Sequence, residues 1–164
     1  MIKKILTMRA GSDVQRYHTA RLIVGETVGH HSANVALIVS QLINPISSNL
    51  LMAALMHDLA EQYTGDVPAT AKWVSVPLKR SLDMLEKFWH EHHDLAIPEL
   101  TEREAKVLKE ADMLDLCFKM LEEYQMGNCT ATTIFDSGIA WLEGSEPTAV
   151  TNRLIEQLKG VMYE

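Results

Sequence analysis

Cysteine is scarce in this 164-residue sequence, which has only Cys117 and Cys129 and no CxxC spacing. A chain of this length buries roughly two-thirds of its unfolded surface, so the low cysteine content argues against a disulfide framework. Long apolar runs are missing as well, and none approaches the roughly 18 apolar residues of a membrane span. The segment 1–6 begins like a signal peptide, but polar residues from Thr7 onward interrupt it. We therefore expect a soluble, cytoplasmic protein with one domain over residues 1–164.

Positive charge is also in short supply, since 15 lysines and arginines face 22 aspartates and glutamates, giving a net charge of −7. A protein that binds long nucleic acid needs a basic stripe, and the sequence has none. The expected partner is therefore a small molecule, and neither a nucleic-acid polymer nor a membrane. A small anionic substrate is compatible with this balance, because a bound metal ion would make its site locally positive.

Alternating strand patterns and internal repeats are missing too, and helical periodicity extends over nearly the whole chain. The predicted fold class is therefore all-α. The expected helices cover residues 2–9, 31–43, 48–63, 76–92, 101–126, 131–142 and 148–162. Residues 14–29 have irregular spacing and two glycines, which predicts a long loop. Loops of that length in a compact domain are usually functional.

One predicted helix contains polar groups where only apolar ones are expected. His57, Asp58 and Glu61 directly follow the apolar run at 50–56 in the predicted helix 48–63. Burying such groups is costly unless they are paired or bind a metal. Residues three or four apart share a helix face, so Glu61 is expected beside both His57 and Asp58. A divalent metal site is the simplest explanation for this group.

Two further residues could complete such a site. His31 lies at the start of the predicted helix 31–43, and Asp112 lies between apolar residues of the long helix 101–126. Taken singly, each is simply explained as a hydrogen-bonded or solvated side chain, whereas their combination is much less expected by chance. Asp115 follows Asp112 by one turn and could support the site. An ion pair with Lys119, four residues later, is the simpler explanation for Asp115.

The order of these residues resembles the H…HD…D pattern of the HD-domain metal-dependent phosphohydrolases. His31 precedes His57 by 26 residues, and Asp58 precedes Asp112 by 54, which is similar to the compact members. The segment HDLAEQYTGDVP at 57–68 resembles the bacterial 5′-deoxynucleotidase branch. The run RYHT at 16–19 resembles both that branch and the related phage dATP triphosphohydrolases. The resemblance implies a helical bundle with its metal site in the core, and a homo-oligomer.

The resemblance further implies one divalent metal held by His31, His57, Asp58 and Asp112. Two imidazoles and two carboxylates suit Mn²⁺, Co²⁺, Fe²⁺, Ni²⁺ or Zn²⁺ rather than Ca²⁺, and the donors alone do not select among them. Such an ion polarises the phosphorus centre and lowers the pKa of the attacking water. A triphosphate substrate could bring additional Mg²⁺.

Four charged residues match family positions that act on the substrate. Glu61 is expected to be a general base or a group that orients water, and Asp66 is expected between the reactive water and the sugar. Arg16 and Lys72 would neutralise phosphate oxygens. Alternatively, Glu61 and Asp66 are solvated carboxylates, and Arg16 and Lys72 are solvated surface cations.

Two neighbouring residues concern specificity. Tyr17 matches a position that is tryptophan in the typical deoxynucleotidase, where the ring disfavours a 2′-hydroxyl. This departure leaves the choice between deoxyribose and ribose open, because a phenol is smaller and can itself form a hydrogen bond. His18 would line the base or phosphate pocket, or would only pack the loop.

These residues predict an enzyme that cleaves the ester between the 5′-oxygen and the α-phosphorus of a deoxynucleotide. The short chain and the RYHT loop favour a dNTP (dATP-type) triphosphohydrolase, and the alternative is a 5′-deoxynucleotidase acting on dNMPs. A nucleotide-binding HD module without turnover is a further alternative, against which the presence of Glu61 and Asp66 argues. A cyclic-nucleotide phosphodiesterase commonly shows additional metal-ligating histidines in the central helices, and these are not evident.

Overall fold

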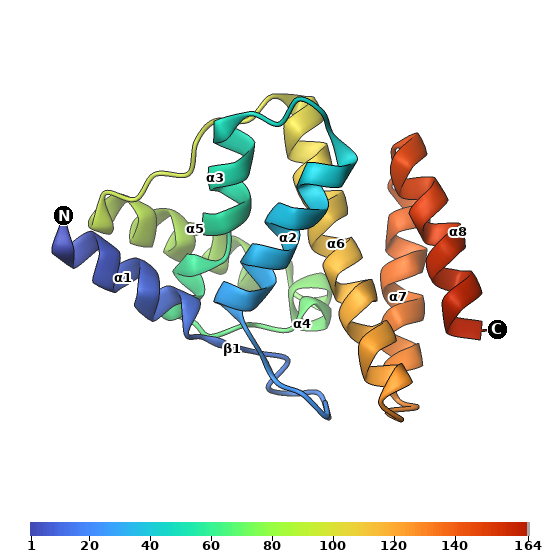
Figure 1. Ribbon diagram of the computed structural model, residues 1–164. Coiled ribbons are helices and arrows are strands. Elements are labelled where there is room, and N and C mark those ends of the chain that lie inside the picture. Colours follow the sequence, from blue (N-terminus) through green and yellow to red (C-terminus); the bar gives the residue numbers. More distant parts are fainter. Residues whose placement is uncertain (164) are drawn as a thin grey trace.

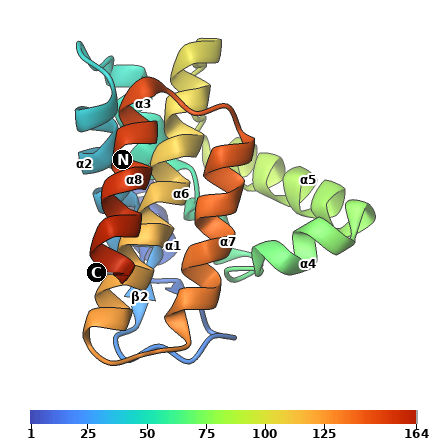
Figure 2. The same ribbon diagram turned by 90° about the vertical axis from the view of Figure 1, so that its right-hand side faces the viewer.

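Helix α6 (Glu102–Gln125) runs through the middle of the computed structural model, which describes residues 1–163. Helices α2 (Val28–Leu42) and α3 (Ser48–Met56) lie on one side of it, and α7 (Ala131–Gly144) and α8 (Ala149–Tyr163) lie on the other (Figure 1). Helices α4 (Ala69–Val74) and α5 (Val76–His93) form an arm that projects from this bundle (Figure 2). The all-α prediction is confirmed. The last residue of the predicted domain 1–164 lies outside the described residues.

The main hydrophobic core gathers around α6. One cluster contains side chains from five helices, all completely buried or nearly so, including Val35, Val39, Leu50, Leu114 and Phe135. Apolar residues spaced three or four apart along each helix build this cluster, and that spacing is what makes an amphipathic helix recognisable in a sequence. The observed bounds of α2, α6, α7 and α8 therefore lie close to the predicted ones. Within residues 1–163, no helix has both the length and the apolar character needed to cross a membrane.

Polar groups fix both the start of α6 and its contact with α8. Thr101 and Glu104 form the capping box, each side chain bonding the backbone N–H of the other. Farther along α6, the buried Glu110 accepts hydrogen bonds from the backbone N–H and the hydroxyl of Thr148 and from the hydroxyl of Thr151. A carboxylate at this position satisfies a free amide and complements the dipole at the N-terminus of α8.

The prediction of one helix over residues 48–63 is wrong. Helix α3 ends at Met56, and a short 3-10 helix, η1 (Leu59–Gln62), follows after His57 and Asp58. The backbone of Asp58, with φ −104° and ψ 2°, departs from helical geometry. The His57–Asp58 pair therefore lies at a junction between two elements. The shared helix face expected for this pair and Glu61 does not exist, because no continuous helix connects them.

Other short elements also differ from the predicted pattern. Within residues 14–29, strands β1 (Gln15–Arg16) and β2 (Glu26–Thr27) pair antiparallel and place Arg16 opposite Glu26. Helix α4 has no buried residue, so it has no apolar stripe that a sequence could reveal. Helix α1 (Ile2–Ser12) continues beyond its predicted end at residue 9 and lies against η1.

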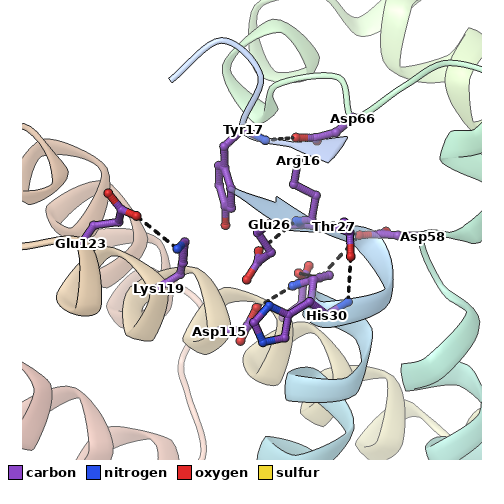
Figure 3. A network of polar contacts seen from close by, with 12 residues as sticks. Arg16, Tyr17, Glu26, Thr27, His30, Asp58, Asp66, Asp115, Lys119 and Glu123 are labelled. Carbon is purple, nitrogen blue, oxygen red and sulfur yellow. Dashed lines mark hydrogen bonds and ion pairs between the residues drawn. The ribbon is translucent and has the colours of Figure 1, made fainter. Parts of the chain in front are cut away.

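Glu123 ties the segment between β1 and β2 to α6. Its carboxylate accepts hydrogen bonds from the backbone N–H groups of Ile23 (2.6 Å) and Val24 (2.9 Å). It also accepts from Nδ2 of Asn128 (2.9 Å) and Nζ of Lys119 (3.1 Å), the latter contact being drawn in Figure 3. Burial by itself would raise the pKa of Glu123, but these four hydrogen bonds outweigh it and lower the pKa to about 2.

Gly11 is required where α1 meets η1. A Cβ at this position would lie 2.6 Å from the backbone oxygen of Leu59, so an added methyl group forces the two backbones apart. We expect Gly11→Ala to lower the free energy of unfolding by about 1–3 kcal/mol, as overpacking does, in urea titrations. Gly144→Ala is the matched control, because a Cβ there meets nothing within 4 Å. Equal stability of Gly11→Ala and the wild type would contradict the close packing of α1.

The hydrogen bonds of Glu123 make stability depend on pH. Because the pKa of Glu123 is lower in the folded state than its ordinary value of 4.5, its contribution is complete above about pH 5 and is lost as the pH falls toward 2. We expect Glu123→Gln to be less stable than the wild type by about 1.5–3 kcal/mol at neutral pH. The difference should shrink on acidification. Urea unfolding along a pH series measures it, and a difference that stays constant down to about pH 3 would refute this role.

Candidate metal centre and active site

Three segments of the chain bring four side chains together: His31 comes from α2, His57 and Asp58 from the turn after α3, and Asp112 from α6. The Nε2 atoms of His31 and His57 lie 3.2 Å apart. Asp112 Oδ1 lies 3.1 Å from Nε2 of His31 and 4.0 Å from Nε2 of His57. Asp58 Oδ2 lies 3.5 Å from each of these nitrogens. The cluster reaches solvent on one side, because His31 is fully buried whereas the Asp112 side chain is 44% exposed.

The outer nitrogen of each imidazole already has a partner. Nδ1 of His31 lies 2.6 Å from Asp115 Oδ2, and Nδ1 of His57 lies 2.9 Å from the backbone oxygen of Ala54. Both partners are acceptors, so each Nδ1 carries a proton and each Nε2 is available to the cluster. Two such lone pairs facing each other at 3.2 Å repel unless a proton or a cation lies between them. His31, His57 and Asp112 lie close enough to hold one metal ion, and Asp58 lies 3.5 Å from both imidazole nitrogens. Two imidazole nitrogens and two carboxylates fit a divalent transition metal.

The charges around the cluster favour a positive charge between these groups, whether it is a proton or a metal ion. Burial opposes protonation of His31, but hydrogen bonds with Asp112 and Asp115 outweigh it and raise the pKa of His31 to about 9. Burial would raise the pKa of Asp58, yet the charges of His57 and Arg16 lower it. The pKa of Asp112 is also lowered, because its hydrogen bond with His31 outweighs burial. The carboxylates are therefore anionic, and the pocket attracts a cation.

Arg16 binds carboxylates on two sides. Its Nη1 donates to Asp58 Oδ2 at 2.7 Å, and its Nε lies 3.5 Å from Glu26 Oε2 (Figure 3). The pairing of β1 with β2 sets Arg16 opposite Glu26, and both side chains are almost completely buried. The charge of Arg16 is therefore shared between two acids, and it holds Asp58 in place. Its expected contact with phosphate stays a prediction.

Tyr17 and Asp66 join the loop to the site. The backbone of Tyr17 has a φ of 55°, in the left-handed region, and its N–H donates to Asp66 Oδ2 at 2.8 Å (Figure 3). The Tyr17 ring packs against the main hydrophobic core, and its hydroxyl is buried without a hydrogen-bond partner among residues 1–163. Asp66 thus fixes the backbone of the residue that was expected to face the sugar. The selectivity role of Tyr17 stays a prediction.

Glu61 lies in η1 and is only 5% exposed. Burial, followed by the negative charges of Asp58 and Asp66, raises the pKa of Glu61 to about 8. Within the described chain its Oε2 atom is buried and has no hydrogen-bond partner. Glu61 therefore holds a proton near neutral pH unless a cation lies close by, and a bound metal ion would lower its pKa and leave the carboxylate able to accept a proton.

Lys72 and His18, the two remaining residues predicted for the site, lie outside the four-residue cluster. Lys72 is half-buried on α4, where its charge partly offsets the effect of burial on the pKa of Glu61 and of Glu86 on α5. His18 is exposed in the turn after Tyr17, and among residues 1–163 it forms no hydrogen bond with the cluster. The structure therefore brings Lys72 to the edge of the site and leaves His18 at the surface.

Two buried acids have contacts that the sequence left open, for Asp115, or did not reveal, for Glu26. Asp115 bonds His31, whereas Lys119, its predicted ion-pair partner, pairs with Glu123 at 3.1 Å. The ion pair favoured for Asp115 and Lys119 is therefore wrong, because the buried ring of a neighbouring helix is the stronger partner. Glu26 has no sequence signal beyond being an acid in the loop, and only strand pairing places it opposite Arg16.

Comparisons with known proteins agree with this geometry. A family model described as 5′-deoxynucleotidase YfbR-like matches residues 5–152. A 5′-deoxynucleotidase of Vibrio vulnificus is 29% identical over 140 residues, which cover 70% of this chain and 71% of the relative. A 5′-deoxynucleotidase of Cronobacter sakazakii is 26% identical over 140 residues, which cover 70% and 69% of the two chains.

Solved structures share the fold. An HD-domain phosphohydrolase from Listeria innocua superposes with a TM-score of 0.79 at 19% identity, covering 99% of this chain and 90% of that one. The HD phosphohydrolase of cyanophage S-2L, bound to dA and one catalytic Zn²⁺ ion, superposes with a TM-score of 0.69 at 17% identity, covering 96% and 95%. Because the family model matches most of the chain, this protein belongs to the YfbR-like 5′-deoxynucleotidase family and is a hydrolase that acts on phosphoester bonds.

Proposed function

We propose that this protein is a metal-dependent 5′-deoxynucleotidase that releases phosphate from deoxynucleoside monophosphates. The observation that carries the proposal is the convergence of His31, His57, Asp58 and Asp112, with both imidazole Nε2 atoms facing inward. The family match and the curated relatives named as 5′-deoxynucleotidases support the monophosphate as substrate. They favour the alternative reading of the sequence over the dNTP triphosphohydrolase, since the phage phosphohydrolase matches in fold alone.

In the proposed site, these four side chains would hold one divalent transition metal, which would polarise the phosphorus centre and lower the pKa of the attacking water. Ala54 and Asp115 hold the outer nitrogens of the two histidines, so both rings present Nε2 inward. Arg16 holds Asp58 in position through its 2.7 Å hydrogen bond. The protein thereby fixes the ligands before the substrate arrives.

Residues around the proposed metal ligands accept the proton of the attacking water and bind the phosphate. Glu61 takes the proton of the attacking water, because its buried Oε2 is not engaged by another group within the described residues. As the bond from phosphorus to the 5′-oxygen breaks, the departing oxygen takes up a proton from solvent water. Lys72, half-buried on α4, neutralises phosphate oxygens. Asp66 fixes the loop through the Tyr17 N–H, and its proposed place is between the reactive water and the sugar. Four expectations from the sequence stay predictions. They are the homo-oligomer, the cytoplasmic location, the base contact of His18 and any added Mg²⁺.

Product analysis tests the proposed reaction. Purified protein loaded with Mn²⁺ or Co²⁺ is incubated with dAMP, AMP and dATP, and the released phosphate, pyrophosphate and triphosphate are separated. We expect phosphate from dAMP as the main product. Triphosphate from dATP without phosphate from dAMP would instead establish a triphosphohydrolase, and no product from any nucleotide would end the enzymatic proposal.

A Glu61→Gln variant separates catalysis from binding. Losing a general base should lower kcat by roughly 10²–10⁴-fold, while metal binding stays at the wild-type level because Glu61 is not a proposed ligand. Stopped assays with dAMP and metal titrations measure the two quantities. Unchanged kcat would remove Glu61 from the reaction, and metal-dependent nucleotide binding without turnover in the wild type would favour a binding module.

Metal removal should lower the melting temperature. Stripping the ion leaves four ionisable groups in one partly buried pocket, and an ion at a hundredfold excess over its Kd stabilises a folded protein by about 2.7 kcal/mol. For a chain of this size, we expect the metal-free protein to melt roughly 5–10 °C lower. Scanning calorimetry with and without Mn²⁺ measures the difference, and His57→Ala is the control that should show no metal effect. Superimposable curves for wild type would count against a metal in this pocket.

A further inference from the structure

We propose that Asp115 is a positioning residue for the candidate metal centre: it holds the buried His31 ring so that Nε2 faces the ion. This inference rests on the proposed function, because it needs His31 to be a ligand. Asp115 itself does not face the inner side of the cluster. It acts through His31, on the opposite edge of the imidazole.

The contact is short and excluded from solvent. Asp115 Oδ2 lies 2.6 Å from Nδ1 of His31. His31 is 0% exposed and Asp115 is 2% exposed, so water does not compete for either group. A hydrogen bond to an ionised acceptor is roughly twice as strong as one between neutral groups, and in a buried place it is weakened little by screening. The ring of His31 is therefore held in one orientation.

Helix α6 holds His31 from both edges. Asp112 and Asp115 are three residues apart and share one face of this helix. Asp112 Oδ1 lies 3.1 Å from Nε2 of the ring, and Asp115 bonds Nδ1. One helical turn thus supplies both a proposed metal ligand and the group that orients a second ligand. Rotation of the ring would break both contacts together.

The two histidines differ in this respect. His57 donates its Nδ1 proton to a neutral acceptor, the backbone oxygen of Ala54, whereas His31 donates to a carboxylate. A charged acceptor makes the opposite nitrogen a stronger donor to a metal. His31 is therefore expected to bind the ion more tightly than His57, and Asp115 is the cause of the difference.

A second cation beside Asp115 does not explain the geometry. Glu26, His31 and Asp115 are close enough to form a potential metal group. However, a metal between Nδ1 and Oδ2 needs about 2.0–2.2 Å to each atom, which separates them by about 3 Å. The observed 2.6 Å is a hydrogen-bond distance. Charge balance for Glu26 comes instead from Arg16, whose Nε lies 3.5 Å away.

The decisive experiment compares Co²⁺ binding by metal-free wild type, Asp115→Leu, Asp115→Asn and Glu110→Gln. Loss of a group that orients a ligand typically weakens metal binding 10–100-fold, so we expect that range for Asp115→Leu. Asp115→Asn keeps an acceptor and loses the charge, and its loss should be smaller. The visible spectrum of bound Co²⁺ should also change in Asp115→Leu, because the bands report the geometry of the ligands.

Glu110→Gln is the matched control. Glu110 lies on the same helix, is 1% exposed, and bonds Thr148 and Thr151 instead of a histidine. This variant should melt at a lower temperature and still bind Co²⁺ with the wild-type affinity and spectrum. A purely structural role for Asp115 predicts that both variants behave alike.

The possible results separate the positioning role of Asp115 from the proposed function of the protein. Wild-type affinity and spectrum in Asp115→Leu overturn the positioning role and leave the proposed metal site intact. A wild type that binds no Co²⁺ overturns the proposed function, and this inference with it. If Asp115→Leu does not fold, as judged by circular dichroism, Asp115→Asn decides: weaker binding supports the role, and unchanged binding overturns it.

Discussion

The structure depends on one electrostatic constraint, the approach of two imidazole Nε2 atoms to 3.2 Å between two carboxylates. Three segments far apart in the sequence must meet for this to happen, and the hydrophobic packing of α2 and α3 against α6 supplies the energy. The turn at His57 and Asp58 also helps to bring the four side chains together. In a continuous helix, these two adjacent side chains would point about 100° apart. The interruption of α3 lets both lie within 3.5 Å of His31.

Charges continue outward from the cluster in alternating sign. Asp58 bonds Arg16, Arg16 faces Glu26, and Lys119 pairs with Glu123, which in turn holds the loop between the two strands. Each buried charge in this series has an opposite charge beside it, which limits the cost of burial. The loop that begins at Arg16 is thus fixed at one end to a proposed metal ligand and at the other to α6. Loop position and ligand position are coupled through these contacts.

The sequence was informative wherever packing alone decides structure. The apolar spacing of α2, α6, α7 and α8 predicts their bounds, and the H…HD…D order predicts which four side chains meet. The sequence did not predict the features of the structure that depend on a partner far away in the chain. The break after Met56, the pairing that sets Arg16 opposite Glu26, and the choice of His31 over Lys119 by Asp115 all depend on tertiary contacts. A local rule such as the i,i+4 ion pair cannot anticipate a buried ring supplied by another helix.

The same charges bear on the choice between a monophosphate and a triphosphate. Arg16 is shared between two carboxylates, and the negative charges of Asp58 and Asp66 act on Glu61, which leaves Lys72 on α4 as the nearby lysine. A monophosphate brings about two negative charges to a site where the proposed ligands Asp58 and Asp112 already offset the two charges of one divalent ion. A triphosphate brings about twice as many, and Coulomb repulsion from the surrounding acids rises with each of them. A triphosphate would therefore gain more than a monophosphate from carrying its own Mg²⁺. The acidic surroundings therefore weigh more heavily against a triphosphate than against a monophosphate, which agrees with the proposed substrate.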